Sequence, residues 1–126
     1  MTNILIVDDS DIWRRLTIDI LKKNPYRLLE ADSGEQALEV ARETPVDLVI
    51  MDYRMHRLNG LDTSRQLRDI PGYEQVPVIL ITSENFPGDC QETPAPDVDG
   101  YVDKKHLIHE LDDCVKYHLS EKARVA

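Results

Sequence analysis

Five side chains able to bind a cation or a phosphoryl group stand at the ends of short apolar runs. They are three aspartates, a threonine and a lysine: Asp8, Asp9, Asp52, Thr82 and Lys104. Carboxylates that lie close together repel one another unless a cation sits among them. Mg²⁺ suits such a set, because it takes one or two carboxylates together with waters and phosphate oxygens. The set therefore predicts a Mg²⁺-dependent site at which a phosphoryl group is transferred to a carboxylate and held.

The elements that must position these residues are five predicted strands. Short apolar runs alternate with longer stretches of helical period, and the runs cover residues 4–7, 27–31, 48–51, 78–81 and 100–102. This alternation predicts an α/β fold with right-handed crossovers, a doubly wound parallel sheet and helices on both faces. Ligands bind at the carboxyl ends of the strands in such sheets. We therefore expect all five side chains at one edge of the sheet.

Helices are predicted in the intervening stretches. Ser10 can cap the first helix, and Ser33 opens the second with a capping box. A third helix spans residues 60–70, and a last one follows residue 102. We expect the tail of the chain, residues 120–126, to fray.

The segment between Thr82 and Gly100 departs from this pattern. It holds four residues that disfavour a helix: Pro87, Gly88, Pro94 and Pro96. A proline inside a helix costs about 3 kcal/mol. We therefore predict that the helix expected here, the fourth along the chain, is short, distorted or missing.

Each site residue has a role that its chemistry allows. Asp52 stands alone at the end of its strand and is the candidate nucleophile, which would carry the phosphoryl group as an acyl phosphate. Asp9 and Asp52 would bind the metal directly, and Asp8 would act through a water. The backbone carbonyl of Arg54 would supply a further oxygen. Lys104 would pair with Asp52 at rest and with the phosphate afterwards.

Thr82 and Tyr101 form a candidate switch. The Thr82 hydroxyl would move toward a phosphoryl oxygen and draw its loop along, and Tyr101 would fill the space that it leaves. Such a coupling between a hydroxyl and a ring is a two-state element. Plain packing is the competing interpretation of Tyr101. Trp13, which follows the acidic pair, would report metal binding through its fluorescence.

The chain resembles the receiver domains of bacterial response regulators, in particular single-domain, chemotaxis-regulator-like ones, over residues 3–119. Four segments in the right order carry the resemblance: Ile4 to Ser10, Met51 to Met55 followed by Asn59-Gly60, Pro77 to Ser83, and Gly100 to Lys104. The resemblance implies one receiver domain over residues 1–126 with the flavodoxin-like strand order 2-1-3-4-5. It also implies the site roles given above.

The resemblance further implies a place in a two-component phosphorelay. A histidine kinase or a histidine phosphotransfer protein would phosphorylate Asp52. The surface near the fourth strand, the fourth-helix region and the fifth strand would then change and control binding of a downstream protein or an effector domain. Such a domain is not an enzyme in the usual sense, because it catalyses only its own phosphotransfer and dephosphorylation. We expect a monomer or a weak dimer.

Two positions near the site depart from the family's pattern. A proline usually follows Met55 and often follows Lys104, but this chain has His56 and Lys105 there. Neither replaced residue carries chemistry, so phosphorylation should survive. Arg54 lies two residues beyond the acceptor, where a long cation can screen the phosphoryl group from water. We therefore expect Arg54 to alter the rate of self-dephosphorylation.

Composition excludes several classes of function. The 126 residues suit one domain, and the net charge of −9 lacks the basic footprint of a nucleic-acid-binding protein. No apolar run is long enough for membrane insertion, and the N-terminus has no basic signal-peptide region, so we expect a cytoplasmic protein. Cys90 and Cys114 lack a metal-binding spacing and are expected to be a loop thiol and a buried helix residue. The four histidines are expected at the surface.

Three alternatives remain. A Mg²⁺-dependent aspartyl phosphohydrolase of the haloacid dehalogenase class would need an Asp-x-Asp pair on the first strand, and this chain has adjacent aspartates there. A flavodoxin-type FMN carrier would need a phosphate-cradling loop where two anionic residues stand. A receiver-like domain that signals without phosphorylation would share every feature described above.

Overall fold

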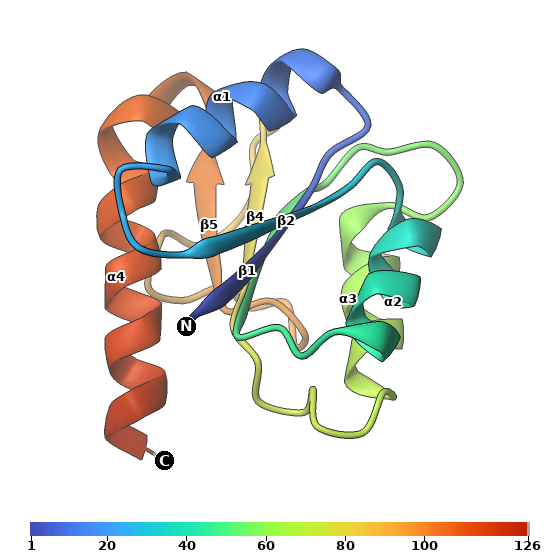
Figure 1. Cartoon of the computed structure of the whole chain (residues 1–126). Coiled ribbons are helices and arrows are strands. Elements are labelled where there is room, and N and C mark those ends of the chain that lie inside the picture. Colours follow the sequence, from blue (N-terminus) through green and yellow to red (C-terminus); the bar gives the residue numbers. More distant parts are fainter. Residues whose placement is uncertain (126) are drawn as a thin grey trace.

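A parallel sheet of five strands forms the centre of the computed structural model, which describes residues 1–125 (Figure 1). The strands are β1 (Asn3–Val7), β2 (Arg27–Ala31), β3 (Leu48–Asp52), β4 (Val78–Thr82) and β5 (Gly100–Asp103). They lie in the order β2-β1-β3-β4-β5, and every neighbouring pair is parallel. The predicted fold class and strand order are therefore confirmed.

Helices cover both faces of this sheet. They are α1 (Asp11–Leu21), α2 (Gly34–Glu43), α3 (Gly60–Arg68) and α4 (Leu107–Val125), with a short 3-10 turn, η1 (Lys104–His106), before α4. In Figure 1, α1 and α4 lie on one side of the sheet and α2 and α3 on the other. None of the helices within residues 1–125 is long and apolar enough to cross a membrane.

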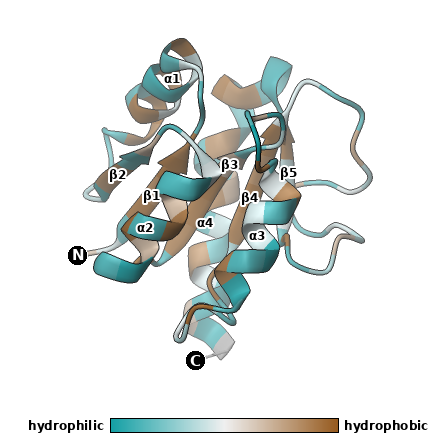
Figure 2. Ribbon diagram, turned by 90° about the vertical axis from the view of Figure 1, so that its right-hand side faces the viewer, coloured by the Kyte–Doolittle hydropathy of each residue, from teal (hydrophilic) through white to brown (hydrophobic). Residues whose placement is uncertain are grey.

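Alternate residues of the strands fill two separate core layers. In β1, Ile4 and Ile6 face the layer beneath α1 and α4, whereas Leu5 and Val7 face the layer beneath α2 and α3. All four are fully buried, as are the residues of β4, and Figure 2 shows that the central strands are largely hydrophobic. Burial on both faces explains the continuous apolar runs, because a strand covered on both sides has no polar face.

Capping and close backbone approach fix where the helices begin. Ser10 caps α1 by accepting a hydrogen bond from the Trp13 N–H, and Ser33 caps α2 as predicted. At the start of α3, a Cβ on Gly60 would lie 2.6 Å from the Asp52 carbonyl oxygen. Only glycine permits this approach, which holds α3 against the end of β3.

Residues 83–99 contain no helix within the part of the chain that the structure describes. The prediction that the fourth helix is short, distorted or missing is thus met in its strongest form. Turns replace the helix: the Asp89 N–H donates to the Glu92 carbonyl at 2.9 Å, and the Tyr101 N–H donates to the Asp89 carbonyl at 2.8 Å. Gly88 has a positive φ of 109°.

Residues 120–126 were expected to fray, and the structure extends helix α4 into this stretch. Helix α4 continues through Val125, and residue 126 lies outside the described residues. The Lys122 ammonium donates to the Asp47 carbonyl at 3.2 Å and lies 3.6 Å from the Asp47 carboxylate. This contact anchors the last turns to the loop before β3.

Candidate functional site

The carboxyl ends of β1, β3 and β5 bring the acidic residues and the lysine together. Asp8 directly follows β1, Asp52 ends β3, and Lys104 directly follows β5. Asp8 and Asp52 are buried. The Lys104 ammonium lies 3.4 Å from Asp52 Oδ1 and 3.9 Å from Asp8 Oδ2. The expected pairing of Lys104 with Asp52 is present in the folded chain.

Asp9 completes a cluster of three carboxylates. One oxygen from each of Asp8, Asp9 and Asp52 lies within 4.8 Å of the others. Asp9 is the most exposed of the three and lines an open hollow of about 240 Å³ together with Arg54, Met55 and His56. The Arg54 residue, whose carbonyl was expected to bind the metal, therefore borders the same hollow as Asp9.

The electrostatics of this cluster are unfavourable without a cation. Burial, reinforced by the negative charge of Asp8, raises the pKa of Asp52 to about 6 against the pull of Lys104. Burial also raises the pKa of Asp8, although the Ser10 N–H and Lys104 oppose this shift. One ammonium does not offset three carboxylates in a buried setting.

The two carboxylate oxygens of Asp8 differ in their hydrogen bonding. Its Oδ1 accepts a hydrogen bond from the Ser10 N–H at 2.9 Å. Its Oδ2 is buried and accepts no hydrogen bond from any described residue. Lys104, at 3.9 Å from Oδ2, is close enough for a charge interaction but too far for a hydrogen bond. Because buried oxygens are rarely left unpartnered, this donor set fits Mg²⁺ or a water that Mg²⁺ holds.

Thr82 and Tyr101 are linked through Glu84. Thr82 is buried at the end of β4, and its Oγ1 accepts from the Glu84 N–H at 3.1 Å. The Tyr101 hydroxyl lies 3.3 Å from both the Glu84 carbonyl and Asp103 Oδ2. The Tyr101 ring packs on Phe86 at 5.5 Å between centroids. A movement of Thr82 would therefore act on the main chain that holds Tyr101.

The Arg54 side chain is held at the mouth of the site by Glu84. Its Nη2 donates to Glu84 Oε1 at 2.9 Å, and its Nε also contacts this carboxylate. The guanidinium lies 5.7 Å from the centroid of the Tyr53 ring. This ion pair joins the loop after β3 to the loop after β4.

Sequence reasoning missed the contact between His56 and Asp9 at this edge. The His56 N–H donates to Asp9 Oδ2 at 3.3 Å, and His56 Nδ1 lies 3.1 Å from the same oxygen. A proline at that position would have no N–H to give, so the departure from the family's pattern was itself the signal. The Lys104 ammonium also lies 4.7 Å from the centroid of the Trp13 ring. Trp13 thus sits against the site.

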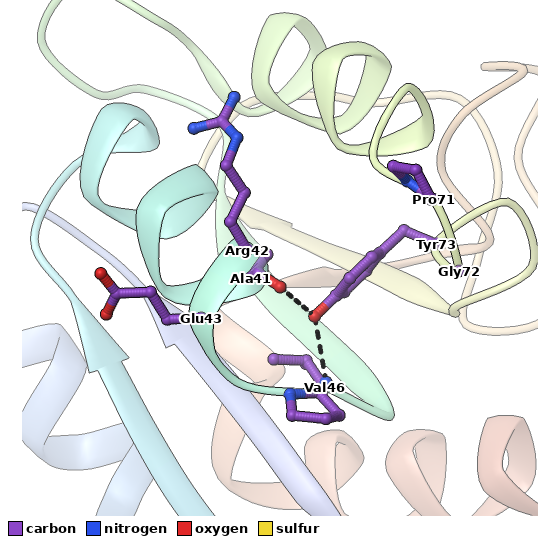
Figure 3. A pocket seen from close by; sticks show the side chains of 8 residues that line it. Ala41, Arg42, Glu43, Val46, Pro71, Gly72 and Tyr73 are labelled. Carbon is purple, nitrogen blue, oxygen red and sulfur yellow. Dashed lines mark hydrogen bonds between the residues drawn. The ribbon is translucent and has the colours of Figure 1, made fainter.

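A second hollow, of about 340 Å³, lies at the opposite end of the sheet (Figure 3). It sits between the end of α2 and the loop before β4, where the Tyr73 hydroxyl donates to the Ala41 carbonyl at 2.6 Å and accepts from the Val46 N–H at 3.2 Å. The hydroxyl ties that loop to the start of β3. No carboxylate of the acidic cluster lines this hollow.

Comparisons with known proteins agree on one family. A sequence model of the response regulator receiver domain matches residues 4–116. The polar-differentiation response regulator DivK of Brucella ovis is 26% identical over 119 residues, covering 94% of this chain and 97% of DivK. The two-component response regulator ORR7 of Oryza sativa is 34% identical over 98 residues, covering 75% of this chain and 47% of ORR7.

Solved structures show the same similarity. The chemotaxis protein CheY4 of Vibrio cholerae is 26% identical, with a TM-score of 0.83, and the match covers 93% of this chain and 98% of CheY4. The receiver domain of the sensor histidine kinase PA1611 from Pseudomonas aeruginosa is 24% identical, with a TM-score of 0.83 over 94% of this chain and 98% of that domain. That domain has a magnesium ion coordinated in its active-site cleft.

Proposed function

Because this chain belongs to the response regulator receiver family, whose members act as switches in two-component systems, we propose that it accepts a phosphoryl group on Asp52. The donor is a histidine kinase or a histidine phosphotransfer protein in the cytoplasm, and the chain acts as a monomer or a weak dimer. One observation carries the proposal: the buried Asp52 carboxylate lies beside two further carboxylates and 3.4 Å from the Lys104 ammonium. Lys104, together with a cation held by the carboxylates, would offset the negative charge that a phosphoryl group adds to Asp52.

The transfer step follows from these residues. An Asp52 carboxylate oxygen attacks the phosphorus of the donor's phosphohistidine, the P–O bond forms, and the P–N bond breaks. The electron pair of the broken bond stays on the imidazole nitrogen. With the pKa of Asp52 at about 6, the nucleophile is mostly ionised at neutral pH. Lys104 then pairs with a phosphoryl oxygen.

Mg²⁺, held by Asp9, Asp52, the Arg54 carbonyl and, through a water, Asp8, would neutralise these carboxylates and the oxygens of the incoming group. The unpartnered Oδ2 of Asp8 and the short separations among the three carboxylates support this assignment. Oxygen-only ligands are what Mg²⁺ prefers in proteins.

Phosphorylation would change the surface of the chain through Thr82 and Tyr101. When the Thr82 hydroxyl turns to a phosphoryl oxygen, it gives up its bond with the Glu84 N–H, and Glu84 moves with its loop. The Tyr101 hydroxyl then loses its contact with the Glu84 carbonyl, so the ring can repack against Phe86. The surface around residues 83–99 and β5 changes, which controls binding of a downstream protein or an effector domain.

Acetyl phosphate and beryllofluoride test the proposal directly. With Mg²⁺, we expect acetyl phosphate to increase the intact mass by one phosphoryl group per chain. Either reagent should change Trp13 fluorescence, because Trp13 contacts Lys104. Asp52→Asn should show neither the mass increase nor the beryllofluoride response. Asp32→Asn, which removes an exposed carboxylate near the same edge, should behave like the unmodified chain.

Other outcomes would point to the alternatives. If the unmodified chain gains no phosphate and gives no beryllofluoride response with Mg²⁺, the proposal is wrong, and signalling without phosphorylation takes its place. Continued hydrolysis of phosphate esters, with many turnovers per chain, would indicate a phosphohydrolase instead. A phosphoryl group that remains on Asp52→Asn would place the acceptor elsewhere.

A further inference from the structure

Two cysteines and a histidine form a second cluster, away from the acidic edge. Cys90 lies in the helix-free segment, and Cys114 and His118 stand one turn apart on α4. One sulfur from each cysteine and one ring nitrogen of His118 all lie within 4.8 Å of one another. The cluster sits at Gly100, the first residue of β5, whereas Lys104 and the acidic site lie beyond the other end of that strand.

The fold makes room for this cluster through Gly100. A Cβ at Gly100 would lie 2.2 Å from the Cys90 carbonyl oxygen and 2.7 Å from His118 Nε2. Glycine is therefore required if the loop and the histidine ring are both to reach β5. His118 Nε2 donates to the Cys90 carbonyl at 2.6 Å, and the Cys114 thiol points to the same oxygen at 3.5 Å. The three side chains are thus already gathered in the folded chain.

Burial and charge at this cluster favour a cation. Cys114 and His118 are buried and Cys90 is partly buried, so the expectation that all four histidines lie at the surface is wrong for His118. Burial raises the pKa of both thiols, and the negative charge of Asp89 adds to it. Without a metal, the thiols stay protonated. Two thiolates and one divalent cation would instead cancel in charge, which a buried site tolerates.

We propose that Cys90, Cys114 and His118 bind a thiophilic divalent cation, with Zn²⁺ as the best fit and the fourth position left to water. Sulfur and imidazole ligands select Zn²⁺ over Mg²⁺, which prefers oxygen. In a tetrahedral zinc site, bonds of about 2.0 to 2.3 Å place the ligand atoms about 3.5 to 4 Å apart. The present ligand atoms lie within 4.8 Å of one another, so binding would draw them closer. A metal bond to His118 Nε2 would replace its hydrogen bond to the Cys90 carbonyl, and the ring proton would move to Nδ1. On binding, each thiol releases its proton to solvent as its metal–sulfur bond forms.

This site would join the helix-free segment to α4. Residues 83–99 carry Cys90 and also contain Glu84 and Phe86, which contact Tyr101. A metal that links Cys90 to two residues of α4 would hold this segment in one conformation. A disulfide between Cys90 and Cys114 would also join the helix-free segment to α4. It would need an oxidant, and it would not involve His118.

Titration of the reduced, metal-free chain with Co²⁺ tests the site. Millimolar Mg²⁺ is kept present and Asp52→Asn is run in parallel, so that the acidic cluster cannot account for binding. We expect one Co²⁺ per chain, a thiolate-to-cobalt charge-transfer band, release of about two protons and displacement by Zn²⁺. His118→Gln should weaken binding by more than about 100-fold, since changes in outer-shell partners alone cost 10- to 100-fold. His109→Gln, an exposed histidine on the same helix, should bind like the unmodified chain.

Cys114 is fully buried, so Cys114→Ser is paired with Cys90→Ser in the loop, and either should abolish the charge-transfer band. A measurement on the unmodified chain avoids mutation altogether: bound Zn²⁺ should protect Cys90 from alkylation by iodoacetamide. The proposal is overturned if the reduced chain binds no Co²⁺, if the band survives both cysteine variants, if His118→Gln binds unchanged, or if Zn²⁺ leaves alkylation unaffected. Loss of two hydrogens in the intact mass during the titration would assign the pair to a disulfide and also overturn it.

Discussion

Asp52 stands between two opposing effects at the scale of single residues. Burial and the neighbouring Asp8 charge disfavour its ionised form, whereas Lys104 favours it. A nucleophile needs the ionised form, and a phosphoryl acceptor must also be shielded from water after the transfer. Burial of the carboxylate beside an ammonium would meet both needs, and it leaves one lysine to offset three carboxylates in the cluster.

Asp52→Asn should therefore stabilise the metal-free chain at neutral pH. The folded-state pKa of about 6 exceeds the ordinary value of 3.8, so the folded chain holds this proton to a higher pH than the unfolded chain does. The resulting penalty is absent below about pH 4 and fully present above about pH 6. We expect Asp52→Asn to raise the free energy of unfolding by about 1 to 3 kcal/mol at pH 7, and this gain to vanish near pH 4. Urea unfolding in EDTA at pH 7 and pH 4 measures this gain, with Glu39→Gln as an exposed control. An equal gain at both pH values would contradict the prediction.

Arg54→Asn should shorten the lifetime of the phosphorylated chain. The ion pair with Glu84 holds the guanidinium at the mouth of the site, where it limits the approach of water. Removal of this side chain is expected to speed hydrolysis of the acyl phosphate several-fold. Loss of the phosphoryl mass with time, after removal of acetyl phosphate, gives the rate. Arg65→Asn breaks a comparable surface ion pair on α3 and should leave the rate unchanged. Equal decay in Arg54→Asn and the unmodified chain would remove Arg54 from this role.

At the scale of secondary structure, local sequence was most informative where burial is continuous. The runs that predicted β1, β3 and β4 are short and continuous because these strands are buried on both faces. The loss of the fourth helix could also be predicted, because each proline inside a helix costs about 3 kcal/mol and this segment holds several. The end of α4 could not be predicted from local sequence, because Lys122 contacts Asp47, which lies 75 positions away in the chain.

The acidic cluster and the cysteine–histidine cluster also differ in how far they could be predicted from the sequence. The acidic cluster could be predicted, since strand ends in a parallel sheet meet at one edge. The burial of His118 could have been predicted from the helical period. His118 stands four residues after Cys114 and seven after Leu111, which are both fully buried. Cys90 could not have been placed with them from sequence. Its position depends on an irregular loop and on the space that Gly100 leaves.

Amide hydrogen exchange should show residues 84–96 as the least protected internal part of the metal-free chain. Their main chain makes few hydrogen bonds, such as the one from the Asp89 N–H to the Glu92 carbonyl. Isolated protection is expected at Asp89 and at Tyr101, the latter in β5. Helix α4 should exchange slowly over its buried middle, around Leu111 to Val115. A continuous protected run of three helical turns across residues 84–96 would contradict both the structure and this prediction.

At the scale of the whole molecule, the helix-free segment connects the two ends of the sheet. It leaves the acidic edge at Thr82 and returns to the other end at Gly100. Carboxylate oxygens gather at the first end, and two cysteine sulfurs and a histidine nitrogen gather at the second. A phosphoryl group would act on the start of the segment and a thiophilic metal on its middle. The phosphoryl group and the metal would then both affect the conformation of the helix-free segment.

The net charge of −9 means that any cation should stabilise the fold to some degree by screening, so specific Mg²⁺ binding needs a sharper criterion. Binding at one site stabilises the folded chain by about 2.7 kcal/mol at 100 times the dissociation constant, and a gain of 1 kcal/mol shifts Tm by about 3 to 6 °C at this size. We therefore expect Mg²⁺ to raise Tm well beyond NaCl of matched ionic strength. Asp9→Asn should reduce the Mg²⁺ effect to that of NaCl, because it removes a proposed direct ligand while leaving the buried Asp8 and Asp52 in place. Equal effects of the two salts on the unmodified chain would show that the acidic cluster holds no specific cation.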